Sequence, residues 1–229
     1  MKYEYVTDLD ELSQSSVEID VKKDGAKMRE IILELKKRME EDNLTALSAP
    51  QIGEKYRIFC IKFIKKKGKT TSTDVKTFVN PVVTGIRGIV IDREADVCLP
   101  DRQFIIYRNN DLSILYQNPL GNPVSQKFSG KSTAVIQLMM DHLDGVLLSD
   151  LGLEIDERFD EATEEEKNEL MDAYMKSLDL YKQELDKDID SDKDLKSMKD
   201  AVDFIQSVRD GKTQLGSPIT VDTSALQEK

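Results

Sequence analysis

The chain has 229 residues, 39% of them hydrophobic and 34% charged, a composition that predicts a soluble protein with one sizeable core. No stretch of 18 or more apolar residues is present, so no membrane-spanning helix is expected. The N-terminal residues MKYEYVTDLDEL lack the apolar segment of a secretion signal. We therefore expect a cytoplasmic location, in which Cys60 and Cys98 stay reduced.

The net charge of −11 is concentrated in the C-terminal third of the chain. Residues 150–229 contain 23 acidic and 11 basic residues, whereas the preceding 149 residues contain 21 and 22. This change predicts two domains, residues 1–150 and an acidic helical extension with an extended tail at residues 151–229. A negatively charged extension repels phosphate groups, so no nucleic-acid partner is expected. The acidity fits either a solvated surface or a docking face for a basic partner.

Hydrophobic periodicity predicts an α+β fold for the first domain. Apolar residues three and four apart indicate helices over residues 28–41 and 132–143. Runs rich in β-branched and aromatic residues indicate short, largely antiparallel strands between them. The expected strands are 56–64, 76–79, 86–93, 104–108 and 112–117, with a polar loop or hairpin tip at 65–74 and a turn at 118–123.

The extension is expected to form a helical hairpin. Thr163 and Glu166 have the spacing of a capping box, in which each side chain binds the other residue's free backbone N–H. Apolar residues then repeat every three or four positions as far as Leu185, and again over residues 195–205. The two apolar stripes are expected to pack on their own domain or against a partner.

Three segments of the first domain carry motifs: ALSAPQIG at 46–53, DVCLP at 96–100 and QLMMDHLDG at 137–145. Their order and content resemble the G-x-G-L-A-A-x-Q, E-G-C-L-S and Q-H-E-x-D-H motifs of peptide deformylase. The resemblance covers about residues 1–150. It implies a peptide-deformylase-like α+β fold, with mostly antiparallel short strands around a central motif-bearing helix.

In that family, a cysteine and two histidines four residues apart bind a divalent metal ion. A glutamate after the first histidine transfers protons, and a glutamine side chain and a backbone N–H stabilise the oxyanion. The resemblance places Cys98 and His142 at two of the metal-ligand positions, and Gln51 and Leu99 at the two oxyanion positions. Gln137 and Asp141 also match the helix motif.

Two positions of the helix depart from the family pattern. Leu138 stands at the first histidine position and Met139 at the glutamate position, and His142 is the only histidine in the sequence. Losing a general base costs about two to four powers of ten in rate, and two ligands rarely hold a catalytic metal ion. We therefore expect no enzymatic activity and no cofactor. An active protein would need Fe²⁺, Zn²⁺ or Ni²⁺ and a third ligand such as Asp141 or Asp96.

Other positions of the motifs are also altered. Leu44, Ala46 and Val97 replace family glycines, and their side chains are expected to narrow the substrate groove. We expect Leu138 and Met139 to fill the former metal pocket, Cys98 and Cys60 to be small buried residues, and His142 to form a hydrogen bond between the helix and a strand. Asp141 or Asp144 would cap nearby backbone.

These expectations lead to one main hypothesis and two alternatives. The main hypothesis is a catalytically inactive peptide-deformylase-like protein that is a structural or protein-binding component of a larger assembly, such as a phage particle. It would bind protein partners through residues 163–210, in the host cytoplasm or the assembled virion. The first alternative is an active metal-dependent deformylase that removes the formyl group from N-terminal formylmethionine. The second is a peptide-binding module that recognises chain termini.

Overall fold

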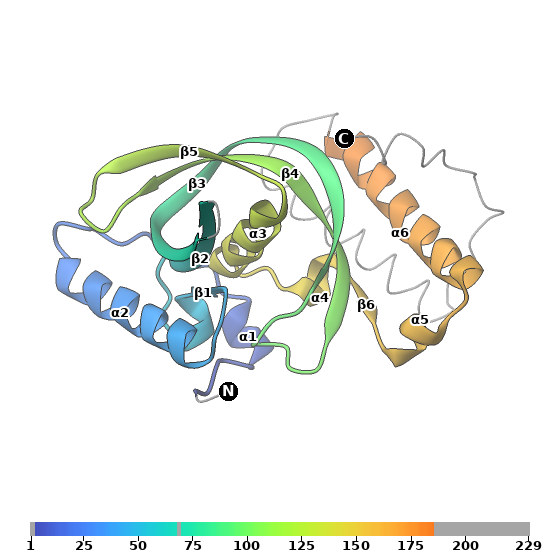
Figure 1. The fold of residues 1–229 in the computed structure, drawn as a ribbon, viewed down its shortest axis with the longest axis horizontal. Helices are drawn as coiled ribbons and strands as arrows, with labels where there is room; N and C mark the ends of the chain where they lie inside the picture. Colours follow the sequence, from blue (N-terminus) through green and yellow to red (C-terminus); the bar gives the residue numbers. More distant parts are fainter. Residues whose placement is uncertain (1–2, 68–69, 186–229) are drawn as a thin grey trace. The chain divides into compact units, whose positions relative to one another are not determined.

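The computed structural model of the protein describes residues 3–67 and 70–185. The chain divides into two compact units, Met1–Leu148 and Ser149–Lys229, whose elements are labelled in Figure 1. That the two parts are separate domains with a boundary at residue 150 stays a prediction. No helix within the described ranges is both long enough and apolar enough to cross a membrane.

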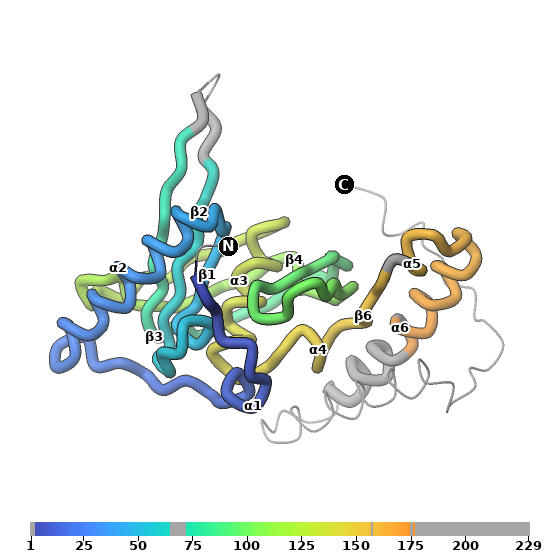
Figure 2. The backbone as a smooth tube through the Cα atoms, turned by 90° about the horizontal axis from the view of Figure 1, so that it is seen from below, coloured from blue at the N-terminus to red at the C-terminus, as the bar shows by residue number. Residues whose placement is uncertain are grey.

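The first unit is built on an antiparallel sheet, as the α+β prediction requires. Its strands β1 to β5 lie in sequence order and each is antiparallel to the next. Figure 2 shows the coloured parts of β2 and β3 side by side, and the two strands pair from Ile58↔Val79 to Lys67↔Thr70. The elements of this part are α1 (Leu9–Leu12), α2 (Gly25–Glu41), β1 (Ala46–Ser48), the 3₁₀ helix η1 (Pro50–Ile52), β2 (Ile58–Lys67), β3 (Thr70–Glu94), β4 (Gln103–Gln117), β5 (Pro123–Ser129) and α3 (Lys131–Asp144).

The strands are longer than the sequence patterns predicted. The two strands expected at 76–79 and 86–93 are parts of the single strand β3, and those expected at 104–108 and 112–117 are both parts of β4. Strand β3 pairs with β2 over its first part and with β4 over the rest, and its register shifts near Val79–Gly85 allow the bend between these partners. Of the two alternatives predicted for 65–74, a polar loop or a hairpin tip, the described residues fit the hairpin, because β2 and β3 stay paired over residues 65–67 and 70–74.

Two clusters of buried side chains lie on opposite faces of β2, because neighbouring residues of a strand point to opposite sides. Ile58 and Cys60 pack in the cluster that contains the apolar face of α2. Phe59 and Ile61 pack in the cluster that contains α3. That second cluster includes stacked and tilted aromatic pairs among Phe59, Phe78, Tyr116 and Phe128. Helix α3 therefore lies against the concave side of the sheet (Figure 1).

The second unit contains β6 (Leu153–Ile155), α5 (Glu157–Glu161) and α6 (Glu164–Leu185), and α4 (Leu148–Leu151) spans the junction of the units. The predicted capping box is confirmed, because the Thr163 N–H and hydroxyl each donate to Glu166 Oε2, and the Glu166 N–H donates to Thr163 Oγ1. Tyr174 of α6 is buried and donates a hydrogen bond to the Leu151 carbonyl. The second predicted helix, at 195–205, and the tail lie outside the described residues.

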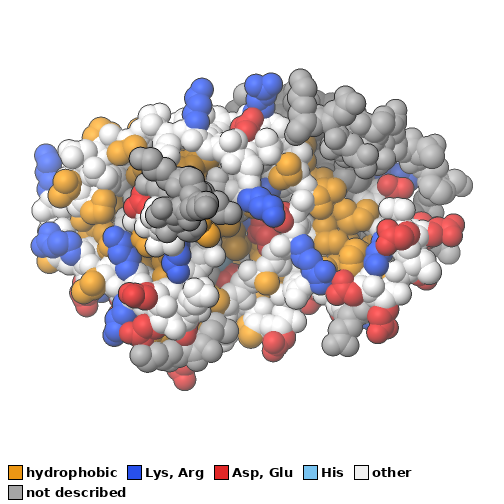
Figure 3. Space-filling model, viewed as in Figure 1, with side chains coloured by type: hydrophobic (Ala, Val, Ile, Leu, Met, Phe, Trp, Pro, Cys, Tyr) orange, Lys and Arg blue, Asp and Glu red, His pale blue; other side chains and the backbone are white. Residues whose placement is uncertain are grey.

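The sequence patterns located the two main helices within a few residues of their ends. The turn at 118–123 is also confirmed, since it joins β4 to β5. Strand β5 was missed because its less exposed positions are Val124, Gln126 and Phe128, and the glutamine breaks the apolar alternation that predicts a strand. Charged and apolar side chains are interspersed on the face of the molecule drawn in Figure 3.

Candidate functional site

The motif residues come together from three separate segments. Gln51 lies in η1, Cys98 and Leu99 lie in the loop between β3 and β4, and His142 lies near the end of α3. All four are buried. The fold therefore brings the predicted positions together, as the resemblance implied.

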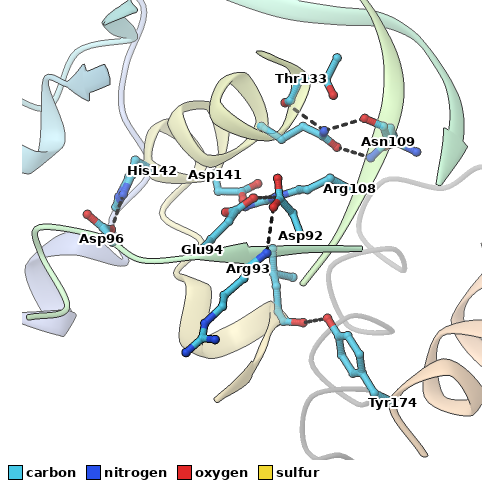
Figure 4. Close-up of polar contacts among 12 residues, drawn as sticks. Asp92, Arg93, Glu94, Asp96, Arg108, Asn109, Thr133, Asp141, His142 and Tyr174 are labelled. Atoms are coloured by element: carbon cyan, nitrogen blue, oxygen red, sulfur yellow. Dashed lines mark hydrogen bonds and ion pairs between the residues drawn. The ribbon is translucent and has the colours of Figure 1, made fainter. Parts of the chain in front are cut away.

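Asp96 is the residue that connects these segments. Its Oδ1 accepts hydrogen bonds from Gln51 Nε2 at 2.8 Å and from the Cys98 backbone N–H at 3.0 Å. Its Oδ2 lies 2.6 Å from His142 Nε2, and Figure 4 shows the two side chains facing each other. We refer to Gln51, Asp96, Cys98 and His142 as the Asp96 cluster.

The contact between Asp96 Oδ2 and His142 Nε2 is buried. Both side chains are 1% exposed. Asp96 Oδ2 and His142 Nε2 have no other partner among the described residues, and His142 Nδ1 has none. Burial raises the pKa of Asp96, but the hydrogen bonds that its carboxylate accepts from His142, Cys98 and Gln51 hold that pKa below its usual value.

The two predicted oxyanion donors both point at Asp96. Gln51 Nε2 donates to its carboxylate, while Gln51 Oε1 accepts from the N–H and hydroxyl groups of Ser48. The Leu99 N–H donates to the backbone carbonyl of Asp96 at 3.1 Å. A bound carbonyl would therefore have to share or replace these bonds.

Cys98 is a buried thiol, as predicted. Burial raises the pKa of this thiol far above its usual value, and the negative charge of Asp96 raises the pKa further. Cys60 is buried as well, and burial raises its pKa to about 11. Both cysteines are free thiols.

Leu138 and Met139 belong to the apolar cluster around α3. Met139 is buried and Leu138 is partly buried there, beside the aromatic side chains of the sheet. At the predicted groove positions, Leu44 and Val97 pack against the α2 cluster and Ala46 packs against the α3 cluster. Side chains thus fill space at each position where the family motif has glycine.

A second buried polar cluster, which the sequence did not reveal, joins the same helix to β3 and β4. Arg108 donates to both carboxylate oxygens of Glu94 at 2.8 and 2.7 Å and to Asp141 Oδ2 at 2.6 Å. We refer to Glu94, Arg108 and Asp141 as the Arg108 cluster, and Figure 4 shows it beside the Asp96–His142 pair. The prediction that Asp141 or Asp144 caps backbone was wrong, because their carboxylates pair with Arg108 and Arg57.

Gln137 matches the helix motif and has a structural contact. Its side chain accepts from the Asn109 N–H and donates to the Asn109 carbonyl, so it ties α3 to β4. Asn109 pairs with Ile89 of β3, but the pairing of β4 with β5 begins only at Asp111, so Gln137 bonds to the backbone edge that β5 does not cover. The only sequence signal for this contact was the motif itself.

The donor set does not match a catalytic metal ion. Among the residues that the structure describes, no group of three or more His, Cys, Asp and Glu side chains could hold one. The His142 Nε2 atom lies 2.6 Å from Asp96 Oδ2 and so faces a carboxylate. Asp96 therefore contacts the imidazole instead of completing a ligand set with it.

Comparisons with known proteins agree over the first part of the chain. The sequence model of polypeptide deformylase matches residues 5–156. A peptide deformylase of Dictyoglomus turgidum is 28% identical over 134 residues, which are 58% of this chain and 82% of that protein.

Two solved structures are also similar. A probable peptide deformylase from Synechococcus phage S-SSM7 has a TM-score of 0.55 and 26% identity, over 61% of this chain and 92% of that one. The peptide deformylase of Thermotoga maritima has a TM-score of 0.54 at 23% identity, over 66% of this chain and 97% of that one, which shows the fold alone.

These findings overturn two predictions. The prediction that the chain is not an enzyme rested on two positions of α3, Leu138 and Met139, whereas the similarity to enzymes extends over residues 5–156. The prediction that no cofactor is expected is also wrong for the family, which uses a catalytic metal ion. The comparisons give no support to a structural role in a particle.

Proposed function

We propose, from the premise that the chain belongs to the polypeptide deformylase family, that it is a peptide deformylase of low activity. Its substrate would be a peptide that begins with formylmethionine, and its reaction would be hydrolysis of the formyl amide. The match of the family over residues 5–156 is the observation that carries this proposal. Formylated nascent chains are made in the cytoplasm, so we propose that location too.

The remaining site residues can position a formyl group. Gln51 Nε2 carries two hydrogens; the side chain donates to Asp96 and also interacts with the Cys98 thiol, so a bound carbonyl oxygen would replace the thiol as an acceptor. The Leu99 N–H lies in the same loop as Asp96 and could share its bond with that oxygen. Such donors stabilise the negative charge that develops on the oxygen in the transition state.

Proton transfer is the weak part of the site. Met139 has no titratable group at the position where the family motif has glutamate, which lowers the expected rate by about two to four powers of ten. The metal that the family uses does not fit the described donor set, so no step is assigned to it. A slow enzyme is therefore expected rather than an efficient one.

The test measures formate release from formyl-Met-Ala-Ser by the purified full-length chain, with Fe²⁺, Ni²⁺ or Zn²⁺ supplied in separate assays. We expect slow turnover that is lost in Gln51→Leu. Met139→Glu should raise the rate, while Met139→Gln, which has a similar shape but cannot transfer a proton, should leave it unchanged. Circular dichroism checks that each variant is folded. Formate release at the level of the protein-free control under all three metals would contradict the proposal.

We further propose that the extension, residues 163–210, binds a protein partner. The support is that α6 begins with three consecutive glutamates, Glu164–Glu166, which lie exposed at its first turn. Basic surfaces are the complement of such a helix. Deleting 164–229 should abolish capture of a basic partner protein and leave formate release unchanged. Retained capture after this deletion would contradict the proposal.

A further inference from the structure

Asp96 contacts each of the segments that the site needs. One carboxylate oxygen binds the Gln51 side chain and the Cys98 backbone, and the other lies 2.6 Å from the His142 imidazole. These residues lie in η1, in the β3–β4 loop and in α3, so a single side chain joins three parts of the fold. No other side chain in the described part of the chain bonds to all three.

The contact between Asp96 and His142 lies where the family motifs place a metal ion. The family motifs place metal ligands at Cys98 and His142, and a metal ion bound to both would connect the β3–β4 loop to α3. In this chain the imidazole nitrogen Nε2 faces Asp96 Oδ2 instead, with both side chains 1% exposed. The donor set around it does not fit a metal ion. The same two segments are thus joined by a carboxylate and an imidazole.

We propose that Asp96 is the cross-link of the site, a positioning residue that holds the Gln51 segment, the Cys98 loop and the His142 helix together where the family motifs place a metal ion. In this arrangement the imidazole of His142 carries its proton on Nε2 and donates it to the carboxylate. This inference concerns what positions the site, and it stands whether or not formyl peptides are hydrolysed.

The two oxygens of the Asp96 carboxylate have different partners, so substitutions can remove the contact with His142 separately from the other two. Asp96→Asn keeps an oxygen that can accept from Gln51 and the Cys98 N–H, but it turns an NH₂ group toward His142. The imidazole must then accept through Nε2, so its proton has to move to Nδ1. Asp96→Ala removes all three contacts. Asp101→Asn, at an exposed residue of the same loop whose positive φ of 61° suits asparagine, is the matched control.

His142 can be observed without mutagenesis because it is the only histidine in the chain. The experiment records the imidazole ¹⁵N and ¹H signals of a full-length protein that carries no histidine tag. We expect a proton on Nε2 that exchanges slowly with water in the unmodified chain and in Asp101→Asn. In Asp96→Asn the proton should lie on Nδ1. A purely structural effect of the substitution would not move it from one nitrogen to the other.

Amide hydrogen exchange tests the remaining contacts. The Cys98 N–H should exchange about tenfold faster in Asp96→Ala than in the unmodified chain and keep most of its protection in Asp96→Asn, since a typical hydrogen bond contributes about 0.5–1.5 kcal/mol. If Asp96→Ala does not fold, the Asp96→Asn spectra decide the matter alone. An unmodified chain with no proton on Nε2 would overturn the proposal, and so would loss of that proton on addition of one equivalent of Zn²⁺.

Discussion

The two buried polar clusters of α3 differ in how completely their charges are balanced. In the Arg108 cluster one guanidinium donates to carboxylates on both sides, and every charged group has a partner. In the Asp96 cluster one imidazole and one carboxylate meet at 2.6 Å, and the imidazole Nδ1 has no partner among the described residues. Asp141 and His142 are neighbours in sequence, yet each belongs to a different cluster.

This difference in hydrogen bonding suggests that the Arg108 cluster stabilises the fold, whereas the Asp96 cluster belongs to the functional site. Buried charges are tolerated when their hydrogen bonds are complete, because each unpaired polar group costs free energy. The complete Arg108 cluster joins β3, β4 and α3 and is expected to stabilise the fold. The incomplete Asp96 cluster, with its buried and unpaired Nδ1, is expected to contribute less to stability and more to function. Four predictions test this comparison.

The largest effect is expected for Arg108→Met. This change leaves the buried Glu94 and the partly buried Asp141 without their cation, which costs about 3–5 kcal/mol of unfolding free energy. Urea denaturation measures the loss. Arg87→Met, on the exposed part of β3, is the control and should change the free energy by less than about 0.5 kcal/mol. Equal effects of the two substitutions would refute a structural role for the Arg108 cluster.

The next effect concerns the end of α3 that carries His142. Gly145 follows the helix at a φ of 72°, and a Cβ there would lie 2.4 Å from the Ser13 carbonyl oxygen. Gly145→Ala should therefore cost on the order of 2–4 kcal/mol, from backbone strain plus the clash. Gly53→Ala is the control, since Gly53 is also left-handed, with a φ of 82° and a ψ of 9°, but a Cβ there would meet only Val6 Cγ2, at 3.9 Å. If thermal unfolding gives the two variants the same loss of stability, the contact with Ser13 does not contribute.

A smaller effect distinguishes the two carboxylate partners of Arg108, Glu94 and Asp141. Two carboxylates face one guanidinium, and burial raises the pKa of both Glu94 and Asp141. Asp141→Asn leaves a balanced pair in which Arg108 keeps both bonds to Glu94, so we expect a loss of less than about 1 kcal/mol. Glu94→Gln removes the charge from the two-bond partner and should cost about 1–3 kcal/mol. The reverse order in urea denaturation would mean that Asp141 is the main partner.

The smallest effect is seen in thiol chemistry rather than in stability at neutral pH. Because burial raises the pKa of Cys98 and Cys60, both thiols should resist iodoacetamide at pH 8 in the native state and react in urea. The folded-state pKa values lie above those of the unfolded chain, so the unfolded chain loses its protons first as pH rises. Native stability should therefore fall above about pH 8.5. Rapid alkylation of Cys98 in the native protein, located and quantified by mass spectrometry, would contradict this prediction, because it would show that this thiol is ionised and accessible.

Local sequence patterns were sufficient for much of the fold. The apolar spacing in α2 and α3 located both helices, because one face of each helix must pack on the sheet. The motif residues Gln51, Cys98 and His142 predicted a common site, and the structure brings them together. The length of β3 was not predictable, since it depends on pairing first with β2 and then with β4.

The sequence by itself determined the resemblance to the family motifs, the loss of two motif residues at Leu138 and Met139, and the presence of a single histidine. It could not decide what His142 contacts, because Asp96 approaches it through the path of the β3–β4 loop. Nor could it identify Arg108, whose carboxylate partners lie 14 and 33 residues away. Hydrogen bonds between residues distant in sequence depend on how strands and helices pack, and only the tertiary structure sets those distances.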